Sequence, residues 1–503
     1  MQPEQNLQGL IFAAVFCDTM EHEILDSYLN SSSIVQHQLD SYNKFIHIGL
    51  QKIIESQSII EPGISDFSIK FTNIRLESPI VIEADGSRKK ITPNEAIIRN
   101  LTYSAPIYIT YVPIISGIEK DINKEEIFIG ELPVMVKSDL CTINNASKEA
   151  LIKLGEDPDN PGGYFIIKGT ERVLIGIEDL APNRITCTKE KKSVTAKVFS
   201  TTLNFRAKTS IVRDEYGTYK IMFPTLTKAT DLILILKALG IDKKQILAQL
   251  SDQEIINDMI LNIDQSKTRD MSQAEAIKEL GRMSAPNQTP EYQAKRAENQ
   301  LDMYLLPHLG IKPEYRMDKA VYLITMAEKA SLVAYKKAKQ DDKDNYSNKR
   351  VKLAGDLMEE LFNNAFKFFI KDIKYHIERT AARGRKLGVR SNINPDVLTE
   401  KILYSMGTGT WPNGQTGVSQ VLERINFVNS ISHLRRIKSP LAKKHPHYKA
   451  RDVHGTHIGK ICPSESPEGP EVGLTKYFAL TAKVTNGIDS QLIEAKLKEL
   501  KLI

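Results

Sequence analysis

The 503-residue sequence has few cysteines and no early hydrophobic run long enough to cross a membrane. Its four cysteines lie far apart and form no CxxC pair, which favours a reducing compartment over a disulfide framework. The apolar run from Leu10 to Cys17 is about eight residues long, whereas a membrane-spanning helix needs roughly 20. The N-terminus also has no positively charged segment typical of a signal peptide. We therefore expect a soluble, cytoplasmic protein without a membrane partner.

Acidic residues are scarce in the C-terminal part of the chain. Residues 1–300 carry 34 Lys and Arg against 40 Asp and Glu, whereas residues 301–503 carry 34 against 22. From Arg424 to Lys460 there are nine basic residues and one acid, Asp452, and the only Trp, Trp411, lies just upstream. Five of the ten histidines also fall here: His433, His445, His447, His454 and His457. The pattern favours a polyanion such as nucleic acid, bound less tightly as salt rises. A lysine-rich loop kept basic for solubility is the alternative.

The spacing of apolar residues predicts a mixed α+β, multidomain fold. At roughly 150 residues per domain, the length suggests about three domains. The predicted elements are helices over residues 6–58, strands over 67–136, a hairpin after 162–163, strands over 182–230 and helices over 231–339. Asp85-Gly86 and the DEYG sequence that begins at Asp214 indicate turns between strands.

The clearest helix follows the charged loop at 341–350. Apolar residues recur every four positions from Leu353 to Ile377, which predicts a core helix. Its far end is basic, with Arg379, Arg383, Arg385, Lys386 and Arg390. The helix macrodipole accounts for cations there as well as a nucleic-acid contact would, so both interpretations stay open.

No catalytic or metal-binding motif is complete. His454, His457 and Cys462 have a metal-like spacing but lack a fourth ligand, so packed or phosphate-contacting histidines are favoured over structural zinc. The acids at 341–344 have no second acidic cluster to complete a magnesium site. The DPDNPG sequence at 157–162 lacks the Glu that a calcium loop needs at its twelfth position, and no nucleophile motif is present.

Several ordered motifs carry a family resemblance. They are ELPVMVKSDLC (131–141), GGYFIIKGTERVLIGIEDLAPNR (162–184), YLLPHLG (304–310), DKDNYSNKRVKLAGDLMEELF (342–362), GVSQVL (417–422), SHLRR (432–436) and GTHIGKICPSESPEGPEVGLTK (455–476). Together they resemble the second-largest, β-like subunit of multisubunit DNA-dependent RNA polymerases, and their wording is closest to the archaeal and eukaryotic branch. Because the chain stops soon after the last motif, it resembles the separate N-terminal half of this subunit in methanogenic archaea.

The resemblance implies a division into named domains. Residues 1–180 and 354–408 would form the protrusion, 181–353 an inserted lobe and 409–483 the fork. Residues 484–503 would begin the next domain and dock on the partner chain.

The resemblance also implies roles for the fork residues. Those expected to contact nucleic acid are Trp411, Gln420, Arg424, Arg435, Arg436, Lys438, Lys443, Lys444 and Arg451. Those expected near the active centre are His454, His457 and Glu468. Ile458 stands where the family usually has Trp or Tyr, so local stacking there is expected to differ.

The implied chemistry is nucleotidyl transfer from ribonucleoside triphosphates with two magnesium ions. The aspartates that hold magnesium belong to the largest subunit in this family, so we expect no cofactor on this chain and no activity of the chain alone. The expected partners are the C-terminal half of the subunit, the largest and other polymerase subunits, template DNA and the RNA–DNA hybrid. The competing hypotheses are a self-sufficient nucleic-acid enzyme and an assembly scaffold without nucleic-acid contacts.

Overall fold

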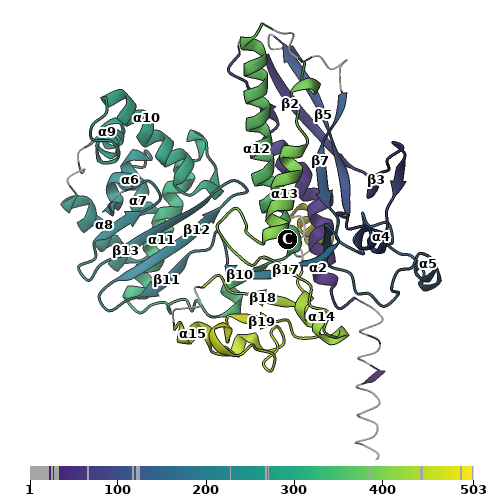
Figure 1. The fold of residues 1–503 in the computed structure, drawn as a ribbon. Coiled ribbons are helices and arrows are strands. Elements are labelled where there is room, and N and C mark those ends of the chain that lie inside the picture. Colours follow the sequence, from purple (N-terminus) through teal and green to yellow (C-terminus); the bar gives the residue numbers. More distant parts are fainter. Residues whose placement is uncertain are drawn as a thin grey trace, which may run out of the picture. The chain divides into compact units, whose positions relative to one another are not determined.

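The computed structural model describes residues 33–502 together with 22–23 and 27, apart from residues 65–66, 116–117, 120–124, 227, 267–268, 270, 385–387, 442–445, 486, 488–489 and 501. The chain forms two compact units, one from Met1–Asp179 with Val351–Ile503 and one from Leu180–Arg350 (Figure 1). Each unit combines helices and sheets, so the mixed fold predicted from the spacing is confirmed. The names protrusion, lobe and fork stay predictions.

An antiparallel sheet forms one layer of the first unit. Its strands run in the order β1-β2-β5-β6, and β7 pairs with β5. The bounds are β1 Ile59–Ile60, β2 Phe67–Leu76, β5 Ser104–Ile115, β6 Ile118–Glu119 and β7 Glu125–Pro133. A separate hairpin, β3 (Ile80–Ile82) with β4 (Arg88–Lys90), turns at the predicted Asp85-Gly86, where Gly86 has φ +80°.

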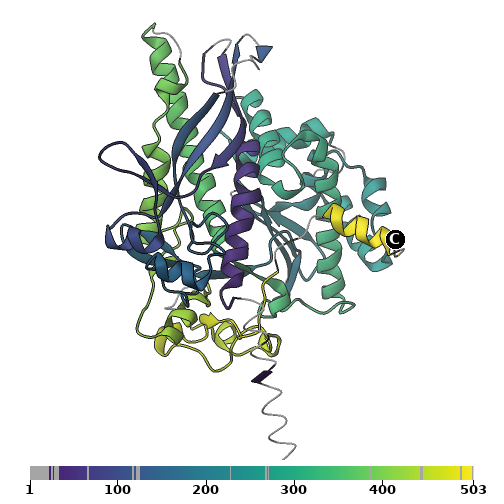
Figure 2. The same ribbon diagram turned by 90° about the vertical axis from the view of Figure 1, so that its right-hand side faces the viewer.

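Further helices of the first unit are α2 Gln36–Lys44, α3 Leu50–Ser56, α4 Pro93–Ile98, α5 Lys148–Lys153, α12 Ala354–Ala382, α13 Asp396–Thr408 and α16 Ser490–Glu499. Helix α3 contacts β2 of this sheet, and α13 contacts β7. A π-helical turn, Phe45–Gly49, joins α2 to α3. Helix α2 can be followed along its length in Figure 2. No helix in the described part of the chain is long and apolar enough to span a bilayer.

Helix α12 is the long helix that the apolar stripe predicts, and α2 fixes where it begins. Gln38 Oε1 accepts the Ala354 N–H at 3.0 Å, and Ser41 Oγ accepts the Gly355 N–H at 3.0 Å. These bonds satisfy amide groups that a helix N-terminus leaves without partners. A Cβ on Gly355 would lie 1.9 Å from the Ser41 carbonyl oxygen. Glycine therefore allows the close approach of the two helices.

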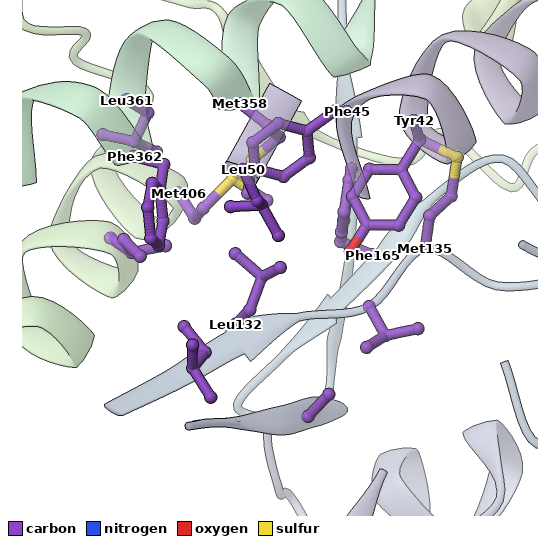
Figure 3. Packing of buried hydrophobic residues seen from close by; sticks show 14 of the residues in the cluster. Tyr42, Phe45, Leu50, Leu132, Met135, Phe165, Met358, Leu361, Phe362 and Met406 are labelled. Carbon is purple, nitrogen blue, oxygen red and sulfur yellow. The ribbon is translucent and has the colours of Figure 1, made fainter. Parts of the chain in front are cut away.

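The core of the first unit joins segments from both ends of the sequence (Figure 3). The Phe45 ring lies 6.3 Å from that of Phe362 of α12, and the Tyr42 ring lies 5.4 Å from that of Phe165. The Tyr42 hydroxyl donates to the Pro133 carbonyl at 2.6 Å, so this buried polar group is satisfied.

Two small sheets complete the first unit. One has the order β17-β9-β8, from Ser419–Val421, Thr170–Leu174 and Phe165–Ile167. The other has the order β16-β10-β18-β19, from Lys349–Lys352, Gly176–Leu180, Arg436–Lys438 and Thr475–Tyr477. The hairpin predicted after 162–163 is the β8–β9 pair and is confirmed.

The second unit has its own sheet and core. The antiparallel sheet runs β11 Thr186–Lys189, β12 Val194–Thr201, β13 Arg206–Arg213, β14 Tyr219–Met222 and β15 Thr230–Asp231. Its helices are α6 Leu232–Ala238, α7 Lys243–Ala248, α8 Gln253–Gln265, α9 Gln273–Ser284, α10 Pro290–Asn299 and α11 Arg316–Ala334. The predicted DEYG turn joins β13 to β14, and Asp214 Oδ1 accepts the Tyr216 and Thr218 N–H groups at 3.0 and 2.9 Å.

Candidate nucleic-acid interface

Short strands hold the basic segment in place within the first unit. Gln420 of β17 lies opposite Val173 of β9, and Ile437 of β18 pairs in parallel with Gly176 of β10. Strand β19 then adds antiparallel to β18. Helices α14 (Phe427–Leu434) and α15 (Tyr448–Arg451) lie in the connections (Figure 1). Strands of the motif at 162–184 therefore pair with the strands that begin in the motifs at 417–422 and 432–436. The strand at the end of the motif at 455–476 is then added to the second of these.

Trp411 is part of the core and not of a surface. Its side chain is 2% exposed, and its indole N–H donates to the Leu357 carbonyl of α12 at 3.0 Å. Its backbone N–H donates to the Gln415 carbonyl at 2.8 Å, which closes the turn that carries residues 412–414 into solvent. The indole thus anchors the loop, because burying an aromatic ring removes a large apolar area from water. Contact of Trp411 with nucleic acid stays a prediction.

Arg435 is buried as well, with 5% exposure. Its guanidinium donates to the backbone carbonyls of Ile34, Ala479 and Leu480. These are segments from opposite ends of the chain. Arg435 therefore holds backbone segments together, and its neighbour Arg436 lies closer to the surface. Contact of Arg435 with phosphates stays a prediction.

A hydrogen-bond network surrounds His433, which is 1% exposed. The Glu423 N–H donates to His433 Nδ1 at 3.1 Å, so the neutral ring carries its proton on Nε2. His433 Nε2 lies 3.1 Å from Gln420 Oε1 and donates to it, and Gln420 Nε2 donates to the Gly417 carbonyl at 3.1 Å. The network fixes the Gln420 amide between the 412–417 loop and α14.

Arg436 closes this network on its other side. It donates to Glu423 Oε1 at 3.2 Å, and its guanidinium lies 5.5 Å from the centroid of the Tyr477 ring. Burial and the Arg436 charge lower the pKa of His433 to about 4, against the opposing effect of Glu423. Although burial alone would raise it, the pKa of Glu423 is lowered by the hydrogen bond and charge of Arg436. The Arg436–Glu423 ion pair is therefore present while His433 is neutral.

Arg424 lies in the exposed part of the segment and already has a carboxylate partner. Its Nε and Nη2 donate to the two Glu171 oxygens at 2.8 and 2.7 Å, a bidentate pair. The guanidinium also lies 5.3 Å from the centroid of the Tyr164 ring. Glu171 comes from the GTERV part of the early motif, which fixes Arg424 at one edge of the site.

Lys438 lines a pocket of about 300 Å³. The pocket lies between the 414–418 loop and residues 438–441, with Ile175 and Ile177 on β10's side. A Cβ on Gly417 would lie 3.3 Å from Lys438 Nζ, so the ammonium group sits against the loop. Lys443 and Lys444, also predicted to contact nucleic acid, lie outside the described residues.

Arg451 organises the turns that follow. Its guanidinium donates to the carbonyls of Pro446 at 2.8 Å, Pro470 at 2.8 Å and Val472 at 2.9 Å. A Cβ on Gly473 would lie 2.2 Å from the Arg451 carbonyl oxygen, so only glycine fits there. The exposed Glu468 lies in the turn that Arg451 holds.

His454 and His457 lie near each other without forming a metal site. Their ring centroids are 6.2 Å apart, and His454 Nδ1 accepts the Thr456 N–H at 3.2 Å. His457 is buried, while Ile458 is 83% exposed. Within the described ranges, no three His, Cys, Asp or Glu side chains are grouped so as to hold a metal ion.

The sequence interpretation assigned no role to several acids that the structure places here. Lys476 Nζ donates to both Glu178 oxygens at 3.0 Å, and the two side chains are 7% and 3% exposed. This buried ion pair joins β19 to β10 across β18. Glu171 and Glu423 pair with Arg424 and Arg436 in the same way. All three acids lie in or beside quoted motifs, but pairing across strands cannot be read from spacing along the chain.

Comparison with known sequences places this architecture in a family. The profile described as "RNA polymerase beta subunit" matches residues 33–400, and that described as "RNA polymerase Rpb2, domain 3" matches residues 420–484. The chain belongs to the family of RNA polymerase beta subunits.

Individual relatives are archaeal. The DNA-directed RNA polymerase subunit Rpo2N of Methanocaldococcus jannaschii is 44% identical over 486 residues, which cover 95% of this chain and 98% of the relative. Rpo2N of Halobacterium salinarum is 39% identical over 490 residues, covering 94% and 93%. Rpo2 of Saccharolobus solfataricus is 40% identical over 486 residues, which cover 95% of this chain but 43% of that protein. The predicted resemblance to the N-terminal half of a split archaeal subunit is confirmed.

Proposed function

We propose that this chain is a subunit of a DNA-directed RNA polymerase, an enzyme that copies DNA into RNA from ribonucleoside triphosphates. In this proposal the chain forms one wall of the DNA cleft, and its 409–483 segment is the fork beside the active centre. It helps position DNA and nucleotides. The protein works with a C-terminal partner chain and the largest subunit.

One observation carries the proposal: described residues in and just before the acid-poor segment are bonded to backbone carbonyls or packed in the core, which restricts their positions. Trp411, Arg435 and Arg451 each bind backbone carbonyls or pack in the core. Cations held in a fixed arrangement bind phosphates with less loss of side-chain and loop entropy. The names of the relatives, which are polymerase subunits over nearly the whole length of this chain, support the same assignment.

The buried and exposed cations divide the roles. Arg435 and Trp411 hold the segment, whereas Lys438 lines the pocket beside the 414–418 loop and the Arg436 side chain is 17% exposed. We infer that Arg436 and Lys438 contact phosphates, Arg as a fork and Lys as a point charge. His454, His457 and Glu468 remain candidates for the side near the active centre.

Metal binding was considered for the described part of the chain only. The described His, Cys, Asp and Glu side chains include no group of three placed to hold a metal ion. We propose that the magnesium ions of the reaction are held by the largest subunit, as the family resemblance implies. The isolated chain is then inactive, and its residues act by binding and orientation.

The test is RNA synthesis by polymerase assembled with each variant of this chain. With Arg436→Gln, we expect elongation to slow about three- to tenfold, because one charged contact worth about 1 kcal/mol is lost, while assembly is retained. Lys449→Gln, in the exposed α15, is the matched control for an exposed cation of the same segment. Arg435→Gln should instead lower the thermal stability of the chain, since three backbone carbonyls lose their donor.

Two results would overturn the proposal. RNA synthesis by the isolated chain would favour a self-sufficient enzyme. Unchanged elongation with Arg436→Gln and Lys438→Gln, in assembled polymerase of normal composition, would favour the alternative of an assembly scaffold that does not touch nucleic acid.

A further inference from the structure

The outer sides of α12 and α13 carry matching stripes of aromatic and basic residues. On α12 the stripe is Phe368, Lys371 and Tyr375, and on α13 it includes Lys401 and Tyr404. Residues at these spacings lie on one side of a helix. The three rings are exposed to solvent, with Phe368 at 44%, Tyr375 at 57% and Tyr404 at 66%. These five residues are called the α12–α13 face below.

The two stripes form one continuous surface. Helices α12 and α13 pack against each other within the first unit (Figure 1). Lys401 Nζ of α13 lies 4.6 Å from the centroid of the Phe368 ring of α12, and Lys371 Nζ lies 5.7 Å from it. Both distances are within the range of cation–π interactions. The exposed ring is therefore surrounded by positive charge from both helices.

A pocket of about 690 Å³ opens beside the α13 stripe. Its apolar lining comes from Val397, Leu403 and Tyr404 of α13 and from Ile167 of β8. Gly407 also lines it, and a Cβ added at Gly407 would meet nothing within 4 Å. The volume lies within the range of about 300–1,000 Å³ that is usual for binding pockets. The pocket can therefore accept apolar side chains from outside the chain.

The charges around the pocket are mainly positive. Lys168 and Lys401 line it together with one carboxylate, that of Glu400. Within the ranges that the structure describes, Lys168, Lys371 and Lys401 form no ion pair with a carboxylate. These lysines are therefore available to a partner's acidic groups, which their charge would attract and orient.

We propose that the α12–α13 face is a docking site for an acidic amphipathic helix of another protein. An apolar side chain of that helix fills the pocket at Gly407, and carboxylates beside it pair with Lys168, Lys371 and Lys401. Amphipathic helices bind grooves in this way, through apolar residues spaced three, four and seven apart. The site adds a protein partner to the proposed function and does not depend on it.

The chemistry of the face favours a peptide over nucleic acid. A nucleic-acid backbone carries a phosphate at every nucleotide, so it would bring negative charge against Glu400. A peptide can place an apolar or basic residue there instead. Stacking on bases needs a free ring face, and Lys401 already lies over the Phe368 ring. An apolar pocket beside exposed aromatic rings is also typical of the anchor positions of protein interfaces.

The test measures binding of a fluorescent peptide to the full chain by anisotropy, at low and at high salt. The probe is about 20 residues long, with Leu at every third or fourth position and Glu at most others, which makes an acidic amphipathic helix. A peptide of the same composition in scrambled order is the control probe. We expect the ordered probe to bind and the scrambled probe to bind about tenfold more weakly or not at all, because its apolar residues no longer share one side of a helix.

Two variants at one position test the pocket. Gly407→Leu fills the pocket and should weaken binding of the ordered probe about tenfold, because the probe's apolar side chain is no longer buried. Gly407→Ala is the matched control, since its added methyl group meets nothing within 4 Å. It should bind the probe within about twofold of the wild type. Thermal unfolding of both variants checks that they are folded.

A second pair of variants tests the charges. Lys371→Gln with Lys401→Gln should weaken binding of the ordered probe about three- to tenfold at low salt and less at high salt, where exposed charges are screened. Lys52→Gln with Lys153→Gln removes two exposed lysines from α3 and α5 of the same unit and is the charge-matched control. This control should keep the wild-type affinity.

Three results would overturn the inference. The first is failure of the ordered probe to bind, or equal binding of the ordered and scrambled probes. The second is wild-type affinity of both Gly407→Leu and the Lys371 and Lys401 double variant. The third is displacement of the bound probe by a DNA duplex or a single-stranded RNA oligonucleotide, which would assign the face to nucleic acid. Retention of the probe in the presence of either nucleic acid supports a protein partner.

Discussion

At the residue scale, similar side chains in one segment do different work because their surroundings differ. Arg435 and Arg436 are adjacent, yet the first binds three backbone carbonyls and the second binds Glu423 and faces Tyr477. A buried guanidinium needs acceptors for its N–H groups. A buried arginine therefore bonds to protein oxygens and stabilises the fold. A charge count along the sequence treats the two as equivalent.

His433 provides a pH prediction at this scale. Its pKa is lowered from 6.5 to about 4 in the folded protein, so the unfolded chain takes up the proton first as pH falls. The contribution of the neutral His433 ring to the free energy of unfolding is complete above about pH 6.5. It is lost as the pH falls from about 6.5 to 4, by up to ~3 kcal/mol. Urea unfolding of the wild type and of His433→Gln, which keeps an acceptor and a donor without titrating, checks this. The difference in the free energy of unfolding between the two proteins should shrink as the pH falls over that range. A difference that does not change with pH would contradict the assignment of a neutral histidine.

At the scale of elements, the site depends on strands that could not form alone. Strands β17, β18 and β19 have three residues each. Strand β17 pairs with β9 and β18 with β10, more than 200 residues earlier in the sequence, and β19 pairs with β18. The buried Glu178–Lys476 pair then fixes which strand lies where. Breaking one member of such a pair typically costs about 3–5 kcal/mol, because the other charge is left buried.

Two glycines in helices provide an element-scale prediction. Gly355→Ala in α12 places a Cβ 1.9 Å from the Ser41 carbonyl oxygen and should destabilise the first unit by about 1–3 kcal/mol or more. Gly407→Ala in α13 meets nothing within 4 Å and should be neutral or stabilise by about 0.5–1 kcal/mol. Thermal unfolding of both variants makes the comparison. Equal changes in stability for the two variants would mean that α2 and α12 lie farther apart than in the structure.

At the scale of the whole molecule, the first unit is built from two distant parts of the chain. Its core joins Tyr42 and Phe165 to Met358 and Phe362, with the second unit inserted between them in sequence (Figure 3). The chain crosses between the units at two points, and there the Ala181 N–H donates to the Asn348 carbonyl at 2.8 Å. The two crossings therefore lie side by side.

This arrangement predicts that the first unit folds without the second. Replacing residues 181–348 with a short Gly-Ser linker should leave helix content and cooperative unfolding of the first unit intact, because adjacent strands are only about 4.8 Å apart. A chain that ends at residue 180 is the control and should not fold, since it lacks α12. Circular dichroism with thermal melting measures both. Loss of cooperative unfolding in the linked chain would contradict the prediction.

The sequence determined the local elements and the family. A four-residue apolar spacing predicts α12, Asp85-Gly86 and DEYG predict turns, and ordered motifs identify the polymerase family, because all three depend on neighbours along the chain. The site residues were only partly predictable. The sequence placed the basic segment, but it did not indicate that Trp411 and Arg435 are buried, or that Glu171, Glu178 and Glu423 pair with its cations. Burial and cross-strand pairing depend on which distant segments meet, and that was decided by the packing of β9 and β10 against the C-terminal strands.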